Sequence, residues 1–237
     1  LTSAFIAGSG MPAIPAMLAA LIVSTLIGFV DAAGITYLKL PPIIMTIAMI
    51  SLIEGGMLIF TQGTPPAGMS PALRDFANST WFFGMANVVF VWLIVSLLAY
   101  WLLNRSKWGR HIYALGTNVK ASYLSGVSAA KINFIVYGLS GFLAGLTGVL
   151  QLGYMGSTYL TMGVPFQLSS IAAVVLGGIS IIGGKGNYLG AIAGVLLITI
   201  LKDVLTVLNI PMAGRELFQG LLILIILLAY GRERKQR

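Results

Sequence analysis

Seven long apolar segments divide this sequence, and they restrict the folds that the chain can adopt more than any other feature. Each approaches the length of about 20 residues that a helix needs to cross the hydrocarbon of a bilayer. Backbone amides in lipid must be hydrogen-bonded within the segment, which favours helices. We therefore predict an all-α polytopic membrane protein with about seven transmembrane helices, at Pro12–Val30, Pro42–Phe60, Gly84–Leu103, Ile132–Leu152, Pro165–Ile182, Tyr188–Leu208 and Glu216–Tyr230.

The composition agrees with a membrane protein and argues against several other classes. Hydrophobic residues make up 58% of the 237 residues and charged residues only 8%, whereas a typical soluble domain has about 25% charged residues. The chain has no cysteine, so the sequence offers neither disulfides nor thiolate metal ligands. Its net charge of +8 comes from basic residues beside the apolar segments. There they set topology, so we predict no nucleic-acid partner.

The distribution of lysine and arginine predicts the orientation of a single membrane domain over residues 1–237. If residues 231–237 form a cytoplasmic tail, eleven of the 14 basic residues lie on the cytoplasmic side, as the positive-inside rule favours. Only Arg74, Lys202 and Arg215 remain for the outer side or the membrane. Residues 61–83 are then a periplasmic loop, and residues 104–131 are a cytoplasmic loop.

The cytoplasmic loop, Asn104–Lys131, is the only long polar interval between two strongly apolar segments. It carries five lysines and arginines and no acidic residue. Its middle, Asn118–Val127, can form about two turns of helix, with Tyr123, Leu124 and Val127 as apolar contacts. Such a helix suits docking against a soluble partner. The spacing leaves a second interpretation open, a solvated loop held near the membrane by its lysines.

Polar and charged side chains occur within or close to several predicted helices, where a charge at the centre costs about 2.5–3.5 kcal/mol on insertion scales. One interpretation is a water-filled path for a hydroxyl-rich solute, lined by Glu54, Gln62, Gln167, Ser169, Lys202 and Asp203. The alternative is that these groups reach the outer interface or pair with one another, as Lys202 with Glu54.

No catalytic constellation is recognisable in the sequence. His111 is the single histidine, so a metal site or a histidine-based triad lacks partners. The glycines at Gly183–Gly186 do not have the spacing of a phosphate-binding loop. We therefore predict a chain that is not an enzyme, with no catalytic residue, no metal and no cofactor of its own.

Two long stretches resemble the permease subunits of ribose-type ABC importers of monosaccharides. Residues 109–126 read GRHIYALGTNVKASYLSG and are followed by VYGLSG at residues 136–141. Residues 167–190 read QLSSIAAVVLGGISIIGGKGNYLG. Thr61, Gly63 and Pro65 add a shorter match in the outer loop. The three motifs fall in order at the expected segments, so the resemblance extends over nearly the whole chain.

The resemblance implies the ABC importer permease fold of about ten helices, of which roughly the first three are absent from this chain. It implies ATP-driven import of a pentose- or hexose-like sugar across the inner membrane by alternating access. The implied partners are a second permease subunit, cytoplasmic ABC ATPase subunits that bind ATP and magnesium, and a periplasmic sugar-binding protein. The residues implied to couple the ATPase to the membrane are Asn118, Ala121, Ser122, Tyr123, Leu124, Ser125 and Gly126.

Departures from the family pattern leave the solute open. Gln167 and Ser169 replace two acidic residues of the second motif, Val119 replaces a common acid after the loop asparagine, and Glu54 occupies a place that is often basic. A nucleoside, a branched-chain amino acid or a signalling furanose is an alternative solute within the same family. Two rival hypotheses are a secondary transporter driven by an ion gradient and a structural subunit without a path of its own.

Overall fold

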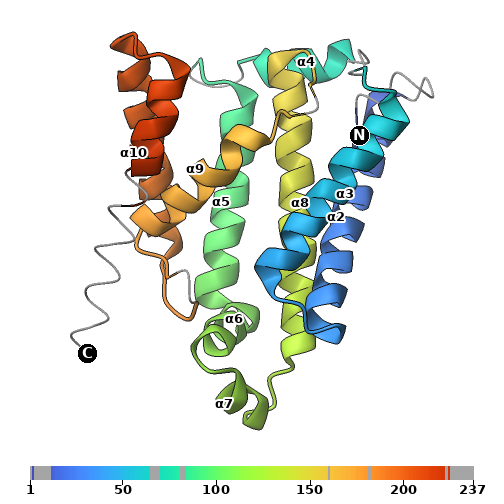
Figure 1. Cartoon of the computed structure of the whole chain (residues 1–237), viewed down its shortest axis with the longest axis vertical. Helices are drawn as coiled ribbons and strands as arrows, with labels where there is room; N and C mark the ends of the chain where they lie inside the picture. Colours follow the sequence, from blue (N-terminus) through green and yellow to red (C-terminus); the bar gives the residue numbers. More distant parts are fainter. Residues whose placement is uncertain are drawn as a thin grey trace. The chain divides into compact units, whose positions relative to one another are not determined.

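The computed structural model describes residues 2, 12–64, 70–80, 84–159, 161–180, 183–221 and 224, and these are mainly α-helical (Figure 1). Their helices are α2 (Ala13–Tyr37), α3 (Pro42–Thr61), α4 (Pro71–Asn78), α5 (Asn87–Arg105), α6 (Lys107–Thr117), α7 (Val119–Leu124), α8 (Ala129–Met155), α9 (Val164–Leu176) and α10 (Tyr188–Val207). Within this part of the chain, α2, α3, α5, α8 and α10 are long and apolar enough to cross a membrane. The predicted all-α polytopic fold is confirmed.

Two helices differ in length from the predicted segments. Helix α2 continues to Tyr37, past the predicted end at Val30, because small and apolar residues follow the single acid at Asp31. Helix α9 has 13 residues and ends at Leu176, whereas the predicted segment ran to Ile182. The Gly177 amide donates to the Ala173 carbonyl at 2.9 Å and closes the helix. With this length α9 is too short to cross a bilayer by itself.

Several predicted features fall partly outside the described residues. Of the seventh segment, residues 216–221 and 224 are described and helical; the rest of it and the tail 231–237 lie outside them. The predicted periplasmic loop contains helix α4, and Gln62 ends α3 in the left-handed conformation, with a φ of 50°. Residues 65–69 and 81–83 of that loop lie outside the described part.

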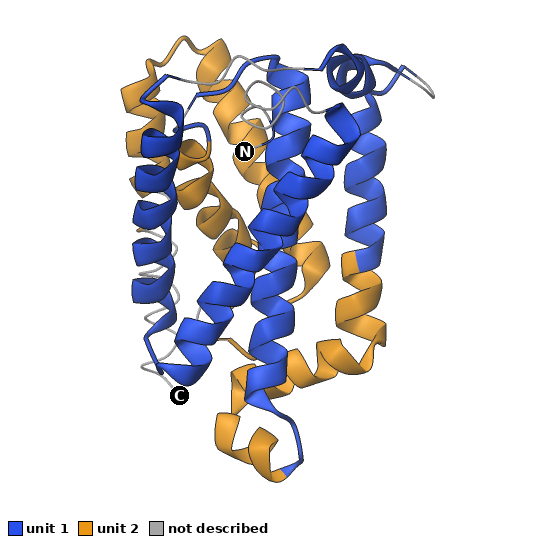
Figure 2. Ribbon diagram, turned by 90° about the vertical axis from the view of Figure 1, so that its right-hand side faces the viewer, with its two compact units in different colours: residues 1–98, 125–162 blue, residues 99–124, 163–237 orange. Residues whose placement is uncertain are grey.

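The chain divides into two compact units, residues 1–98 with 125–162 and residues 99–124 with 163–237, and each is described by itself (Figure 2). In the first unit, α2 and α8 pack along each other with their backbones in contact. A Cβ added to Gly28 would collide with the Tyr137 carbonyl, and one added to Gly141 would collide with the Ser24 carbonyl. Small residues permit this close approach of two apolar helices, as in other membrane proteins.

Helix α4 is fixed to the end of α8 in the same unit. The side-chain amide of Asn78 donates to the Gly153 carbonyl at 3.2 Å, and Leu73 forms a buried cluster with Val149 and Leu152. Leu73 is 3% exposed, so a helix within a predicted loop contributes to the core of the unit. The Pro71 at its first position suits a helix start, because that residue needs no intrahelical amide bond.

In the second unit, α9 and α10 are in backbone contact along one face. A Cβ on Gly194 would meet the Ala173 carbonyl, and a Cβ on either Gly177 or Gly190 would meet the carbonyl of the other. Ala173 and Ile198 belong to the buried core of this pair. The two helices cannot slide along each other at these points, because backbone atoms make the contacts and protein interiors are close-packed.

Candidate functional site

The predicted cytoplasmic loop contains two helices, α6 and α7, where the sequence predicted one short helix. Helix α6 begins after Ser106, whose hydroxyl accepts a hydrogen bond from the Gly109 amide at 3.1 Å. Serine is one of the preferred residues at a helix N-cap, and this signal in the sequence was available to predict α6. The remaining part of the prediction, a short helix starting after Asn118, agrees with α7.

Asn118 and Gly126 bracket α7. The Asn118 side-chain oxygen accepts from the Ala121 amide at 3.1 Å, so Asn118 caps the N-terminus. Two residues after the helix, Gly126 has a φ of +79°, a conformation that glycine adopts at little cost and other residues rarely adopt. These two residues therefore define where the six-residue helix begins and where the chain turns away.

The end of α7 presents two large apolar side chains to solvent. Leu124 is 85% exposed and Tyr123 is 77% exposed, whereas Ser122 is 5% exposed. The polar Ser122 is thus buried, and the apolar Tyr123 and Leu124 are exposed. A helix that packs only against its own protein shows the reverse arrangement, with its apolar side chains buried. Neighbouring exposed apolar side chains of this kind suit a protein interface. Lys107 and Arg110 on α6 and Lys120 on α7 are also exposed.

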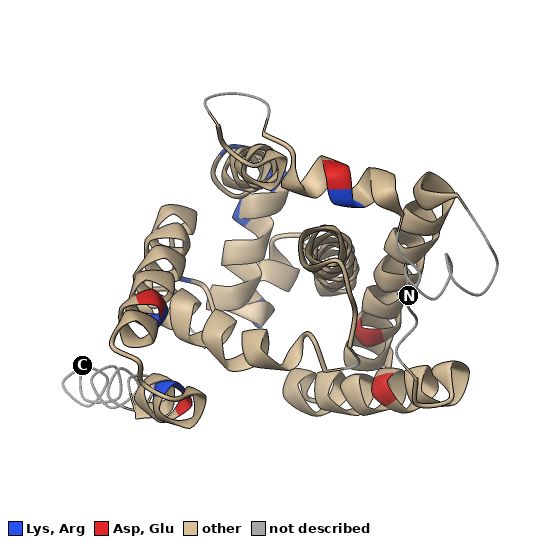
Figure 3. Cartoon of the chain, turned by 90° about the horizontal axis from the view of Figure 1, so that it is seen from above, with Lys and Arg blue, Asp and Glu red and all other residues tan. Residues whose placement is uncertain are grey.

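The predicted solute-path residues fall into both units. Charged residues are sparse along the long helices (Figure 3). In the first unit, Glu54 is exposed on α3 and Gln62 is exposed at its end. In the second unit, Gln167 is exposed on α9 and Asp203 is exposed on α10. The assignment of these side chains to one common path therefore stays a prediction.

Ser169 and Lys202 differ from the other predicted path residues. Ser169 is 7% exposed, and its hydroxyl donates to the Pro165 carbonyl at 2.6 Å. A hydroxyl that donates to the preceding turn of its own helix has its proton engaged in that hydrogen bond and does not donate it to a solute. Lys202 is half-buried, and its carbonyl accepts from the Thr206 hydroxyl at 2.7 Å.

Asp31 is an intramembrane acid that the sequence prediction missed, because the predicted segment stopped one residue before it. Its Oδ1 is buried and has no hydrogen-bond partner among the described residues. On one side of it along α2, Gly28 lies against the Tyr137 carbonyl of α8. On the other side, the Thr36 hydroxyl accepts from the Asn133 side-chain amide at 3.2 Å. A carboxyl group inside a membrane helix is a candidate functional residue by its cost alone.

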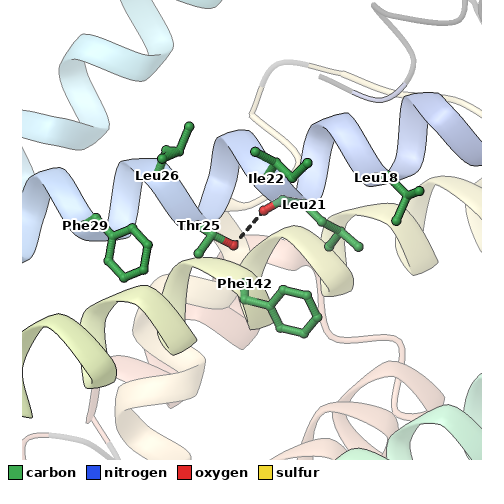
Figure 4. A pocket seen from close by; sticks show the side chains of 7 residues that line it. All are labelled: Leu18, Leu21, Ile22, Thr25, Leu26, Phe29 and Phe142. Carbon is green, nitrogen blue, oxygen red and sulfur yellow. Dashed lines mark hydrogen bonds between the residues drawn. The ribbon is translucent and has the colours of Figure 1, made fainter.

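A groove of about 290 Å³ lies between α2 and α8 in the first unit. Its lining is apolar apart from one hydroxyl, that of Thr25, which donates to the Leu21 carbonyl at 2.7 Å (Figure 4). The other residues that line it are Leu18, Ile22, Leu26, Phe29 and Phe142. Recognition of a hydroxyl-rich solute needs several polar groups, so this groove does not have the chemistry of a sugar site.

Comparison with known proteins identifies the family. The family described as branched-chain amino acid transport system / permease component matches residues 1–227. The autoinducer 2 import system permease protein LsrC of Salmonella typhimurium is 33% identical over 228 residues, which cover 96% of this chain and 65% of LsrC. The ribose import permease protein RbsC of Escherichia coli K12 is 33% identical over 238 residues, covering 98% of this chain and 73% of RbsC.

The chain spans 65% of the length of LsrC and 73% of the length of RbsC. No solved structure matches it. The five long apolar helices of the described residues, the three sequence motifs and the match over residues 1–227 agree with one another. The predicted resemblance to importer permeases is confirmed, and the chain belongs to the family of branched-chain amino acid transport system permease components.

Proposed function

We propose that this chain is the membrane-spanning permease subunit of an ATP-driven importer, and that it moves a monosaccharide across the inner membrane by alternating access. The observation that carries the proposal is the exposed pair Tyr123 and Leu124 at the end of α7, 77% and 85% exposed, in a family of transport permeases. The names of two relatives, for ribose import and autoinducer 2 import, support a small polar solute.

The coupling surface consists of α7 and the residues beside it. Tyr123 and Leu124 insert into a groove of a cytoplasmic ABC ATPase subunit, and burial of each contributes about 1.5–3 kcal/mol. The exposed basic side chains of α6 and α7 favour acidic residues on that subunit. Asn118 and Gly126 fix the ends of the helix, and Ala121, Ser122 and Ser125 complete it. This role places residues 104–131 and the C-terminus in the cytoplasm and residues 61–83 in the periplasm.

The energy for transport is supplied by the partner, which binds ATP and magnesium. ATP shifts the transporter only to the extent that it binds the closed ATPase pair more tightly than the open pair. Closure of the ATPase pair displaces α7. The membrane helices then close the solute path on one side of the membrane and open it on the other. Glu54, Gln62, Gln167, Lys202 and Asp203 supply donors and acceptors for solute hydroxyl groups. Affinity for the solute along this path is weak, because tight binding would prevent release.

A second permease chain and a periplasmic binding protein complete the proposed assembly. The test uses the full-length permease purified with its ATPase subunits in proteoliposomes, with the binding protein outside and ATP inside. We expect uptake of radiolabelled ribose or autoinducer 2 that depends on ATP and persists when ionophores collapse the proton and sodium gradients. Leucine and adenosine serve as competitors for the alternative solute classes.

Two results would contradict the proposal. Uptake that needs an ion gradient and proceeds without ATP would assign the chain to the secondary transporters, with Glu54 and Asp203 as candidate coupling acids. Purification of two different permease chains, with the groups that contact solute only in the other one, would assign it a structural role. Inhibition by leucine or adenosine, with no effect of sugars, would replace the solute and leave the ATP-driven mechanism in place.

A further inference from the structure

The turn between α9 and α10 touches the end of α6 through backbone atoms. We call residues Gly183–Gly186 the glycine turn; with α6, α7, α9 and α10 it lies in the second unit (orange in Figure 2). A Cβ on Gly116 would collide with the Gly184 amide nitrogen and lie 3.0 Å from its Cα. A Cβ on Gly184 would lie 2.6 Å from the Thr117 hydroxyl and 2.8 Å from the Thr117 nitrogen. Only glycine fits at either position.

The glycine turn is hydrogen-bonded to Ser180 in the segment that follows α9, and α10 begins directly after it. The Ser180 amide donates to the Lys185 carbonyl at 3.0 Å, and the Gly183 amide donates to the Ser180 carbonyl at 3.1 Å. The next residue, Asn187, caps α10 by accepting from the Leu189 amide at 3.2 Å. Since α9 and α10 are also in backbone contact with each other, a force applied at Gly184 reaches both helices with little intervening slack.

The other side of the contact lies directly beside α7. Thr117 is the last residue of α6, and its hydroxyl donates to the Tyr113 carbonyl at 2.9 Å. The next residue, Asn118, is the cap of α7. The path from the exposed end of α7 to the glycine turn therefore runs through one short helix and its cap. On the C-terminal side of α7, by contrast, a Cβ added to Gly126 would meet no atom within 4 Å. Gly126 therefore makes no close contact comparable to that of Gly116.

We propose that the contact between Gly116 and Gly184 is the mechanical link that passes the displacement of α7 to α9 and α10. This inference rests on the proposed function, because it assumes that an ATPase moves α7. Gly116 and Gly184 act as positioning residues: they touch neither solute nor ATP, and they set the distance between the docking helix and two membrane helices. Transport then depends on the absence of side chains at this contact.

The first test compares Gly184→Ala and Gly116→Ala with Gly163→Ala, in the full importer with its ATPase subunits. The control position precedes α9 in the same unit, has a φ of −83° and has no atom within 4 Å of an added Cβ. Carbon atoms rest at about 3.5–4.0 Å, and a Cβ on Gly116 would lie 3.0 Å from the Gly184 Cα, so an alanine at Gly116 must separate the two backbones by roughly 0.5–1 Å. The quantity measured is the number of solute molecules imported per ATP hydrolysed.

We expect this ratio to fall at least tenfold in Gly184→Ala and Gly116→Ala, with ATPase subunits still bound and ATP still hydrolysed, and to be unchanged in Gly163→Ala. A contact that only stabilises the fold would lower assembly, hydrolysis and uptake together and leave the ratio unchanged. That result, or normal uptake, would overturn the inference. If the unaltered importer showed no ATP-dependent uptake, the proposed function itself would fail, whatever the variants did.

A second variant decides the matter if the alanine variants do not assemble. The given sequence has no cysteine, so Thr117→Cys with Lys185→Cys provides a defined pair of thiols in it, which a short bifunctional methanethiosulfonate reagent can join through reducible disulfides. A rigid link stays closed throughout the transport cycle, so we expect the cross-linked importer to keep at least half of its uptake. Loss of uptake on cross-linking, restored by a reducing agent and absent from each single-cysteine variant, would show that the contact must open and would overturn the inference.

Discussion

Replacement of Leu124 by aspartate tests the docking surface directly. Leu124 is 85% exposed, so the substitution should change the free energy of unfolding of the permease by no more than about 0.5 kcal/mol. In the complex, the same side chain is proposed to be buried. Loss of its apolar burial costs about 2 kcal/mol, and a carboxylate without a partner in the interface adds to this cost. Since 1.4 kcal/mol corresponds to tenfold in affinity, we expect the affinity for the ATPase subunit to fall by roughly 30-fold or more.

The assay has two parts, made on the same purified protein. The affinity of the permease for labelled ATPase subunit is measured by titration in detergent, and uptake is measured in proteoliposomes with saturating ATP. Leu124→Met is the matched control, because it keeps an apolar side chain of similar volume. Thermal unfolding of each variant shows whether the fold is intact. Unchanged affinity and normal uptake in Leu124→Asp would refute the assignment of α7 as the docking helix.

Three further predictions concern the backbone and the buried polar groups. Gly126→Ala should lower the stability of the loop by about 1–2 kcal/mol, because the φ of +79° is unfavourable for alanine; thermal unfolding should show a lower Tm, while Gly148→Ala, with no atom near the added Cβ, should not lower it. Asp31→Asn should raise the Tm, since the buried Oδ1 lacks a partner among the described residues and an amide costs less to bury than a carboxylate; a lower Tm would indicate a partner for the carboxylate. Ser169→Ala should leave the KM for solute unchanged, because the hydroxyl already donates to the Pro165 carbonyl; a several-fold increase in KM would show that the hydroxyl binds solute.

The sequence predicted the long helices well where the apolar run and its end signals agree. Helix α10 starts at Tyr188 as predicted, because Asn187 both interrupts the apolar pattern and caps the helix. The end of α2 was missed, because Asp31 interrupts the apolar pattern without interrupting the helix. The end of α9 was missed for the opposite reason, because the apolar pattern continues past Gly177 while the helix does not.

For the candidate site, the sequence predicted α7 but neither α6 nor the contacts around both helices. The cap at Asn118 is a local feature and is therefore visible in the sequence. The contact of Gly116 with Gly184 joins segments far apart in the chain, and a close backbone approach leaves no signal except the glycines themselves. Likewise, Ser169 looked like a polar lining residue, because sequence alone does not show that its hydroxyl bonds the preceding turn.

The close seam between α2 and α8 also has a consequence for the biogenesis of the protein. Gly28 and Gly138 lie against each other's helices, yet roughly 100 residues are synthesised between them, which takes about 5–20 s at usual translation rates. During that interval α2 is without the helix that its glycine seam packs against. The seam between α2 and α8 can therefore form only late in synthesis, after α3, α4 and α5 have been made.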